Sequence, residues 1–336
     1  MVLFLAESPL QVISCYELFK QKFSGERVLL VVKYSGERKK KTHDYQLKKT
    51  IEALDWPECT EVSFLCRIKQ FSWVKKRFVK YKIIKACEGR ASVVCMGDFK
   101  SEWMHDLKIR LLPESVYLTD DGVGVIEAKE KYIDKGLFHR NKKLGWLSGD
   151  DYVQPIIFSS FVSSSGDGSS VHNDYRALRA ESRSKATDVE AVFYFGAKYS
   201  EAGIMSLEDE LVLISKAKLY FEERGKKIKY IPHRADTLGK LELIESQLNI
   251  PVNPLGLPAE LYLLKLDYLP WGIAGAFTSA LLSLDKLFDF ESVVSFEVPS
   301  AVLRAESSRA ISNIYKEYRQ AGIDVVGLDF NKHDRI

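Results

Sequence analysis

Four polar groups in this sequence each follow or interrupt an apolar run of the kind that forms strands. They are Asp120-Asp121-Gly122, His233, Glu260 and Thr278-Ser279. In an open α/β sheet, ligands bind at the carboxyl ends of the strands. We therefore expect these groups to converge on one cleft between two halves of the chain. A carboxylate pair in one half, with an imidazole, a carboxylate and two hydroxyls in the other, suits transfer of a group away from a phosphate.

The pair Asp120-Asp121 stands before Gly122, which permits the backbone angles of a tight turn. Adjacent acids in such a turn point in different directions. One is then a candidate general base, while the other makes structural hydrogen bonds. An ordinary polar turn is the alternative interpretation.

His233 follows Pro232 at the end of a predicted strand and precedes Arg234. An imidazole in this place can donate a hydrogen bond or a proton to a leaving phosphate. Arg234 would raise the local positive potential. The alternative is a histidine in a surface loop.

Thr278-Ser279 stands between a glycine-rich strand and an apolar helical run. The free amides and the dipole at a helix start favour phosphate, although either residue could simply cap the helix. Glu260 opens another predicted helix, where it either accepts hydrogen bonds from ribose hydroxyls or stabilises the first turn. The fingerprints G-x-x-x-x-G-K-[ST] and G-x-G-x-x-G at a strand-to-helix turn are absent, which disfavours P-loop ATPases and ordinary dehydrogenases.

The elements that must position these groups alternate between strand and helix in both halves of the chain, which predicts an α/β fold of two doubly wound domains. A polar, glycine-rich stretch predicts a linker between them. The predicted parts are residues 1–160, the linker 161–187, residues 188–302, and a C-terminal helix and tail over 303–336 that could pack on the first domain.

The composition fits a soluble protein of 336 residues with a net charge of +3, too small by itself to indicate nucleic-acid binding. We expect a cytoplasmic protein, because the sequence has neither a secretory signal nor a run long enough to span a bilayer. Five cysteines without C-x-x-C spacing predict reduced, structural thiols (Cys15, Cys59, Cys66, Cys87 and Cys95).

The segment Arg67–Lys85 combines basic residues with aromatic ones. Phe71, Val74, Phe78 and Tyr81 recur at helical spacing within it. It is interpreted either as a core-packed helix with a solvated basic face, or as a contact for anionic lipid of the inner membrane or for an acidic glycan. Nucleic-acid binding is disfavoured, because no recognised module accompanies the basic run.

With these motifs in this order, the chain resembles the bacterial sialyltransferases of the GT-B fold, in the capsule polysialyltransferase and lipooligosaccharide sialyltransferase group. That group has a D/E-D/E-G motif, a His-Pro motif, a helix-start Glu and a Ser/Thr pair. The segment Glu7–Gln11, the loop Met96–Asp98 and the pair Phe195-Gly196 are further landmarks. Arg234 stands where the family usually has proline.

The resemblance implies two Rossmann-like domains and a metal-independent, inverting transfer of a nonulosonic acid from a CMP-activated donor to a surface glycan or glycolipid. It implies no cofactor. Asp121 would be the base, with Asp120 beside it, and His233 would assist departure of CMP. The implied donor-binding residues are Glu260, Thr278, Ser279, Gly196, Pro232 and Gly275. The implied acceptor-side residues are Glu7, Ser8 and Gly97.

Three hypotheses follow from the sequence. The first is this nonulosonate transferase. The second is another GT-B enzyme that uses a UDP-sugar, either a transferase or an epimerase. The third is a protein that binds anions or glycans without catalysis.

Overall fold

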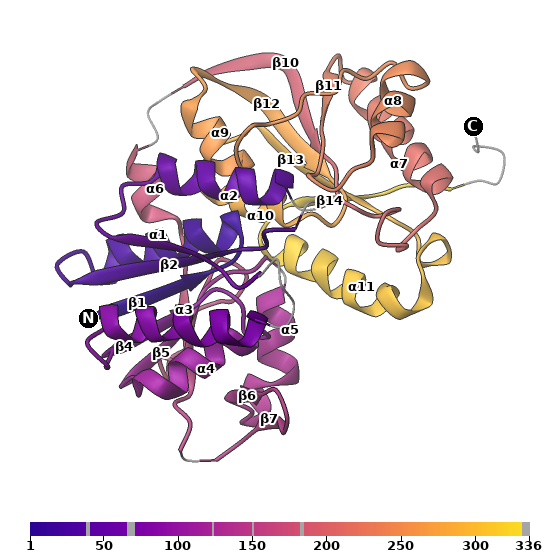
Figure 1. The fold of residues 1–336 in the computed structure, drawn as a ribbon. Coiled ribbons are helices and arrows are strands. Elements are labelled where there is room, and N and C mark those ends of the chain that lie inside the picture. Colours follow the sequence, from indigo (N-terminus) through magenta and orange to yellow (C-terminus); the bar gives the residue numbers. More distant parts are fainter. Residues whose placement is uncertain (38–40, 66–70, 123, 150, 182–184, 331–336) are drawn as a thin grey trace. The chain divides into compact units, whose positions relative to one another are not determined.

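The computed structural model describes residues 1–37, 41–65, 71–122, 124–149, 151–181 and 185–330, which fold into two compact α/β units. Unit 1 is Met1–Ala180 and unit 2 is Glu181–Ile336. Figure 1 shows the elements of each unit along the chain.

Unit 1 is built on a seven-stranded sheet in the order β3-β2-β1-β4-β5-β8-β9, and all of its neighbouring strands are parallel. Its strands are β1 (Val2–Ala6), β2 (Val28–Tyr34), β3 (Cys59–Ser63), β4 (Val93–Met96), β5 (Ser115–Leu118), β8 (Pro155–Ser159) and β9 (Ser170–His172). Every residue of the interior strand β1 is buried. Such a strand reads as a continuous apolar run because both faces of a parallel sheet are covered.

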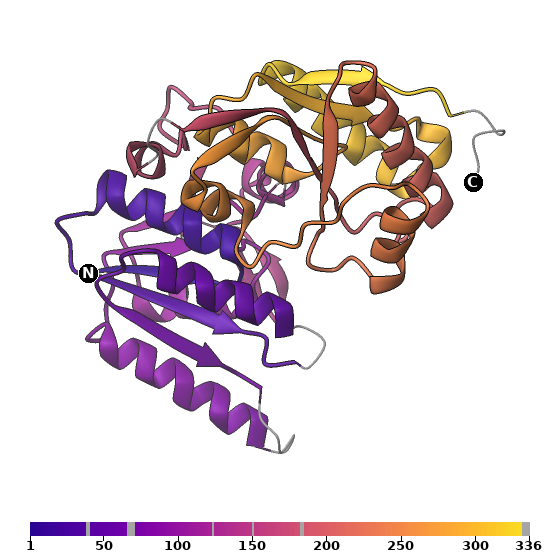
Figure 2. The same ribbon diagram turned by 90° about the horizontal axis from the view of Figure 1, so that it is seen from above.

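Helices cover both faces of this sheet, and Figure 2 shows α2 and α3 on opposite sides of it. The helices are α1 (Pro9–Lys22), α2 (Lys41–Ala53), α3 (Ser72–Ala86), α4 (Glu102–Leu111), α5 (Gly124–Lys131) and α6 (Arg176–Glu181). Ser8 caps α1, because its hydroxyl accepts a hydrogen bond from the Gln11 amide, and Pro9 occupies the first turn.

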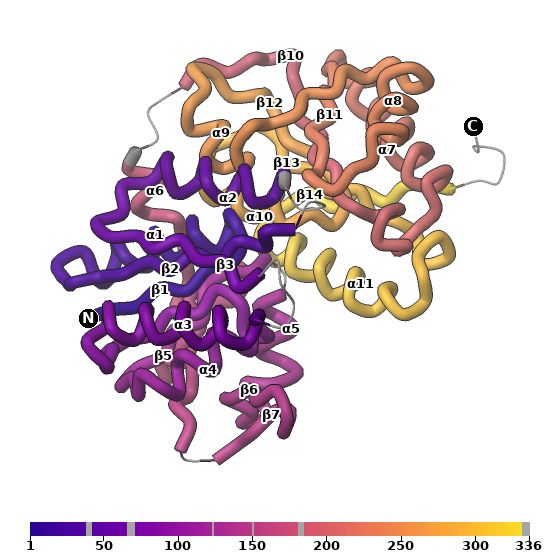
Figure 3. Tube along the Cα trace, viewed as in Figure 1, coloured from indigo at the N-terminus to yellow at the C-terminus, as the bar shows by residue number. Residues whose placement is uncertain are grey.

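A short antiparallel ribbon, β6 (His139–Asn141) with β7 (Gly145–Leu147), follows α5 and the 3₁₀ turn η3 (Ile133–Lys135). The trace in Figure 3 shows the ribbon beside α4, which β6 contacts. Gly145, which opens β7, has a φ of +78° in the left-handed region that glycine tolerates.

Unit 2 contains a five-stranded parallel sheet in the order β11-β10-β12-β13-β14. Its strands are β10 (Ala186–Phe195), β11 (Lys227–Ile231), β12 (Tyr268–Gly275), β13 (Ser292–Glu297) and β14 (Asp324–Gly327). Its helices are α7 (Leu207–Glu222), α8 (Leu238–Ser246), α9 (Ala259–Lys265), α10 (Ser279–Leu287) and α11 (Ala305–Gln320), with the 3₁₀ turn η4 (Ser300–Val302).

Two helix boundaries in unit 2 have local causes. The Ser206 hydroxyl accepts a hydrogen bond of 3.0 Å from the Asp209 amide and caps α7. The C-terminal helix α11 stops before Gly322, whose φ is +85°. Helix α11 contacts β13 and β14, so it packs within unit 2.

The division of the chain differs from the predicted one in the middle. Within the predicted linker, β9 pairs with β8 and extends the sheet of unit 1. Unit 1 consequently continues to Ala180, and 303–336 belongs to unit 2. The serine-rich sequence conceals this strand because β9 is three residues long and lies at the edge of the sheet.

The core-packed interpretation of the basic segment is wrong for its aromatic residues. Phe71, Trp73, Phe78 and Tyr81 are each more than half exposed. Among the described residues of α3, Ile83 is the one buried side chain. The predicted start of the segment, 67–70, lies outside the described residues.

Four cysteines lie within the described residues, and all four are free thiols (Cys15, Cys59, Cys87 and Cys95). Burial raises the pKa of each, most strongly for Cys95, and a protonated thiol is a poor nucleophile. Cys66 lies outside the described residues. Within the part of the chain that the structure describes, no helix is both long and apolar enough to cross a bilayer.

We predict that Gly196→Ala destabilises the fold by about 1–3 kcal/mol, because an added methyl group would collide with the buried Tyr230 phenol. Gly256→Ala is the matched control, since nothing lies within 4 Å of a methyl group there and its φ is not positive. Denaturant unfolding of both variants measures the difference. Equal stabilities would contradict the packing described for β10 and β11.

Candidate functional site

The carboxyl ends of β1, β4 and β5 carry the predicted groups of unit 1. These strands are neighbours in the sheet, with β4 between β1 and β5. The residues that follow them are Glu7 and Ser8 after β1, Gly97 and Asp98 after β4, and Asp120 and Asp121 after β5. The structure thus brings Glu7, Ser8, Gly97, Asp120 and Asp121, the unit 1 residues that the sequence predicts, to one edge of the sheet.

Asp120 is fully buried and structural. Its Oδ2 accepts hydrogen bonds from the Ser160 amide at 2.9 Å, the Ser160 hydroxyl at 3.1 Å and the Ser14 hydroxyl at 3.4 Å. Burial raises the pKa of Asp120 to about 6, and the hydrogen bonds from Ser160 and its neighbours oppose this rise. Asp120 therefore ties β5 to the end of β8.

Asp121, by contrast, is exposed. The amide Nε2 of the buried Gln11 donates a hydrogen bond of 2.7 Å to Asp121 Oδ1, and Gln11 Oε1 accepts one from the Glu7 amide. Gly122 has a φ of +64°, so the turn after the acids requires glycine. The two acids thus divide as the sequence predicts, one oriented toward solvent and one bonded inside.

Gly97 makes room for this arrangement. A methyl group at Gly97 would lie 2.7 Å from Gln11 Oε1 and 2.8 Å from Gln11 Cβ. Any larger residue would displace the Gln11 side chain that holds Asp121. Gly97 therefore makes room for Gln11, which positions Asp121 and which the sequence analysis names only as the last residue of the segment Glu7–Gln11. The signal for Gln11 in the sequence is a polar residue among apolar ones in the first turn of α1.

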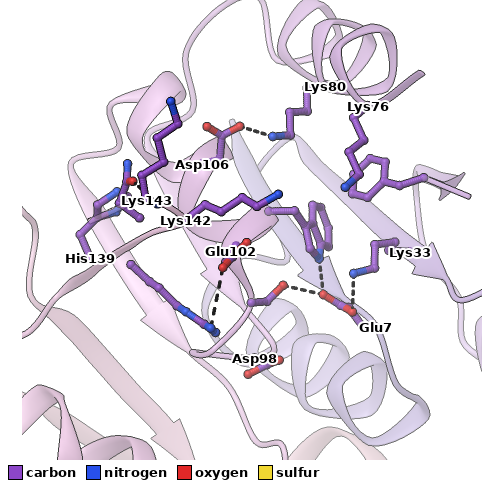
Figure 4. Close-up of a pocket in the computed structure, with 15 residues that line it drawn as sticks. Glu7, Lys33, Lys76, Lys80, Asp98, Glu102, Asp106, His139, Lys142 and Lys143 are labelled. Carbon is purple, nitrogen blue, oxygen red and sulfur yellow. Dashed lines mark hydrogen bonds and ion pairs between the residues drawn. The ribbon is translucent and has the colours of Figure 1, made fainter. Parts of the chain in front are cut away.

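A charged pocket of about 660 Å³ opens beside these residues, and Figure 4 shows its lining. Glu7 lines this pocket, pairs with Lys33 at 2.6 Å and accepts hydrogen bonds from the Ser101 hydroxyl and the Trp103 indole. Asp98 lines both this pocket and a smaller one of about 120 Å³ that contains Asp121. The charged pocket and the smaller pocket lined by Asp121 therefore lie next to each other, with Asp98 in the lining of both.

Cations dominate the lining of this pocket. The cationic residues are Lys33, Lys76, Lys80, Arg140, Lys142 and Lys143, and the acidic ones are Glu7, Asp98, Glu102 and Asp106. Lys80 pairs with Asp106, and Arg140 lies 3.8 Å from Glu102. Within the described residues, Lys76, Lys142 and Lys143 form no ion pair, which leaves the pocket with a surplus of positive charge. Such a pocket attracts an anionic ligand.

In unit 2, the carboxyl ends of three neighbouring strands carry most of the predicted donor-side residues. Strand β10 lies between β11 and β12, and its last residue, Phe195, is in register with Ile231 and with Gly275. The residues at these ends are Gly196 after β10, Pro232 and His233 after β11, and Gly275, Thr278 and Ser279 at the end of β12 and the start of α10.

His233 is a neutral hydrogen-bond donor in this arrangement. Burial, together with the nearby cations Arg234 and Lys198, lowers the pKa of its imidazole to about 4. Nδ1 accepts a hydrogen bond of 3.1 Å from the Ala235 amide, so the proton of the neutral ring resides on Nε2. The exposed Lys198 and Arg234 give the same edge a positive potential that favours phosphate.

A buried ionic cluster around Lys240 holds the loop that contains His233. The Lys240 ammonium is fully buried and contacts Glu210 at 2.6 Å, Asp236 at 3.0 Å and Glu201 at 3.2 Å. The carboxylate of Asp236 also accepts a hydrogen bond of 2.9 Å from the His233 amide. Removal of one partner from such a cluster would leave a buried charge uncompensated.

The start of α10 presents backbone amides that the side chain of its N-cap residue does not satisfy. Thr278 occupies the N-cap position without a side-chain capping hydrogen bond. Gly275 is required here, because a methyl group would lie 2.8 Å from Thr278 Cγ2 and 2.9 Å from the Phe195 carbonyl oxygen. The uncapped helix start adjoins the β10 and β11 ends, and it can accept an anion.

Glu260 opens a helix, as the sequence predicts. It stands in the first turn of α9 and is buried, with 7% of its surface exposed. Its Oε1 accepts a hydrogen bond of 2.6 Å from Ser283 on α10, and burial raises the pKa of its carboxyl. This bond joins the first turn of α9 to the middle of α10.

Within the described residues, no group of three or more His, Cys, Asp or Glu side chains is placed to hold a metal ion.

No protein-family model matches the sequence, and a search of curated proteins finds no match. Solved structures do resemble the chain. A protein from Listeria monocytogenes, described as a candidate UDP-N-acetylglucosamine 2-epimerase, has a TM-score of 0.56 and 9% identity, over 96% of this chain and 90% of that one. A UDP-GlcNAc 2-epimerase from Neisseria meningitidis bound to UDP-GlcNAc has a TM-score of 0.50 and 9% identity, over 95% and 90%.

These likenesses cover both units, and both units have parallel sheets flanked by helices. The chain therefore has a GT-B-type fold of two Rossmann-like domains, as the sequence predicts. At 9% identity the likeness establishes the fold and no more.

We predict a specific pH dependence for Asp120→Asn. The pKa of Asp120 is raised from 3.8 to about 6, so the stability that its protonated form contributes is complete below pH ~4 and is lost as the pH rises through ~6. The stability of the wild type relative to Asp120→Asn should fall by about 3 kcal/mol over that range. Urea unfolding at a series of pH values measures this difference. Parallel stability curves for the two proteins would refute it.

Proposed function

We propose that this chain is an enzyme that transfers a sugar from a nucleotide-activated donor to a hydroxyl group, with inversion. Unit 2 binds the nucleotide and unit 1 supplies the base. The observation that carries the proposal is the placement of Asp121 after the end of a strand. Its carboxylate is exposed and is oriented by a hydrogen bond from the buried Gln11 amide. A base of this kind must reach the substrate and keep a fixed direction.

The proposed binding of the nucleotide donor is supported by the groups at the carboxyl ends of β10, β11 and β12 in unit 2. His233 offers Nε2–H, Lys198 and Arg234 supply positive charge, and the α10 start offers backbone amides. Donors of these three kinds converge on phosphate oxygens in many nucleotide sites. They stabilise the negative charge that develops as the nucleotide leaves.

In the proposed reaction, Asp121 accepts the proton of the acceptor hydroxyl, and the acceptor oxygen forms a bond to the anomeric carbon. The bond from that carbon to the phosphate oxygen breaks, and its electron pair goes to the nucleotide. His233 donates a hydrogen bond to the departing phosphate and remains neutral throughout. The proposed steps use side chains of this chain alone.

The acceptor is proposed to be an anionic glycan or glycolipid, because the pocket beside Asp121 has a surplus of cations. Lys142 and Lys143 lie on the turn of the β6–β7 ribbon and line this pocket without ion pairs within the described residues. A phosphate or carboxylate on the acceptor would pair with them.

Two donor classes are supported by different observations. A UDP-sugar is supported by the structural likeness to a UDP-GlcNAc 2-epimerase bound to its nucleotide sugar. A CMP-activated nonulosonic acid is supported by the order of Asp120-Asp121-Gly122, His233, Glu260 and Thr278-Ser279. The UDP-sugar has the structural support, so we place it first. A UDP-sugar epimerase is the second candidate function, because both similar structures carry that description.

Calorimetric titration with UMP, UDP, CMP and CDP tests the donor class directly. A ligand that binds the folded state also raises the unfolding temperature. Preferential binding of UDP supports the UDP-sugar, and preferential binding of CMP supports the nonulosonate. Incubation with each nucleotide sugar, with and without acceptor, separates transfer from epimerisation. Failure of every nucleotide to bind would overturn the proposal in favour of non-catalytic anion or glycan binding.

We predict that Asp121→Asn lowers kcat by ~10²–10⁴-fold while nucleotide affinity changes little, because the amide cannot accept the proton. Asp55→Asn, a change at another exposed acid, is the control and should leave both quantities unchanged. Initial rates at saturating donor measure the effect. A loss below about tenfold would exclude Asp121 as the base.

We predict that His233→Ala weakens nucleotide binding by ~1.5–3 kcal/mol, because a hydrogen bond to a charged group is lost. His233→Gln should recover part of this loss, since the glutamine amide can still donate. Calorimetric titration with the preferred nucleotide measures both variants. Unchanged affinity in His233→Ala would show that the phosphate binds elsewhere.

A further inference from the structure

Helix α3 presents an unusual surface for a helix of a water-soluble unit. Phe71 at its start and Val74, Phe78 and Tyr81 along it are exposed, at the spacing that places them on one face. Trp73 beside them is 61% exposed. The opposite face carries the buried Ile83, so the helix is anchored to the unit and its aromatic face points away.

The same helix is strongly cationic. Its cationic residues are Lys75, Lys76, Arg77, Lys80, Lys82 and Lys85, and Ser72–Ala86 contains no acidic residue. Lys80 and Lys76 reach toward the charged pocket, as Figure 4 shows. Arg77, Lys82 and Lys85 form no ion pair within the described residues. These three flank the aromatic face, and the Lys82 ammonium lies 4.8 Å from the centre of the Phe78 ring.

We propose that α3 docks unit 1 onto an anionic lipid bilayer. An amphipathic helix that lies in a membrane interface inserts aromatic side chains at the headgroup level, while Lys and Arg contact anionic headgroups. Both requirements are met on one face of α3. The helix lies along the outside of the unit, as Figures 1 and 2 show.

Two other partners for this face, a second copy of the chain and a soluble acidic glycan, fit it less well. A second copy of α3 would place cations against cations, which repel. A soluble acidic glycan could pair with Arg77, Lys82 and Lys85, but it would leave Phe78 and Tyr81 without an apolar partner. A bilayer satisfies the cations and the aromatic side chains together.

The experiment uses the full chain and vesicles of phosphatidylcholine with or without phosphatidylglycerol. We expect the wild type to float with the mixed vesicles, to bind phosphatidylcholine alone far more weakly, and to lose binding as salt rises. Arg77→Gln with Lys82→Gln and Lys85→Gln should weaken binding by roughly 100-fold, because each cation near an anionic surface contributes ~1 kcal/mol. No substrate is present, so the result is independent of the proposed function.

A second variant tests the aromatic residues. Trp73→Ser with Phe78→Ser and Tyr81→Ser should also abolish flotation, and circular dichroism should show an intact fold because these side chains are exposed. The matched controls are Leu219→Ser with Leu238→Ser, at exposed apolar positions of unit 2, and Lys48→Gln with Lys129→Gln and Lys131→Gln, on other helices. Both controls should bind as the wild type does.

Three outcomes would overturn the proposal. The wild type could fail to bind mixed vesicles, or a control could lose binding as strongly as the α3 variants. The serine variant could also bind as the wild type does, which would show that the cations act without the aromatic face and would favour a soluble polyanion as the occupant.

Discussion

Parallel pairing within each large sheet is the constraint on which both candidate sites depend. When neighbouring strands run in the same direction, their carboxyl ends lie at one edge, and the loops that follow them become neighbours. In unit 1 this gathers Glu7, Gly97 and Asp121, which are separated by more than a hundred residues of chain from first to last. In unit 2 it gathers Gly196, His233 and Gly275. The apolar strands that enforce this pairing are buried and take no part in the chemistry.

Buried polar contacts then give each edge its fixed geometry. Asp120 binds the end of β8 from inside unit 1, while Gln11 holds Asp121 from the first turn of α1. In unit 2, the Lys240 cluster holds Asp236, and Asp236 holds the His233 loop. Charges are placed in such interiors only when they are paired, because desolvation of an unpaired ion is costly. The exposed groups are thus oriented by buried side chains.

The net charge of +3 conceals a strongly uneven distribution. Cations gather in the pocket of unit 1, on α3 and around His233. The local potential at these places is therefore positive, which fits phosphates, anionic acceptors and anionic headgroups. Burial, together with the nearby cations Arg234 and Lys198, keeps His233 neutral, so it can donate a hydrogen bond to phosphate without first gaining a proton.

The sequence by itself determined the α/β class, most strands and helices, and the strand-end placement of Asp121 and His233, because apolar periodicity and turn residues act locally. It could not find β9 or the β6–β7 ribbon, whose three-residue strands are specified by their neighbours. Nor could it show that Gln11 holds Asp121 across 110 positions, or that Glu260 bonds Ser283. Only the tertiary structure shows that the aromatic face of α3 is exposed. Helical spacing in the sequence shows that the aromatic residues share one face, but whether this face is buried depends on what packs against it.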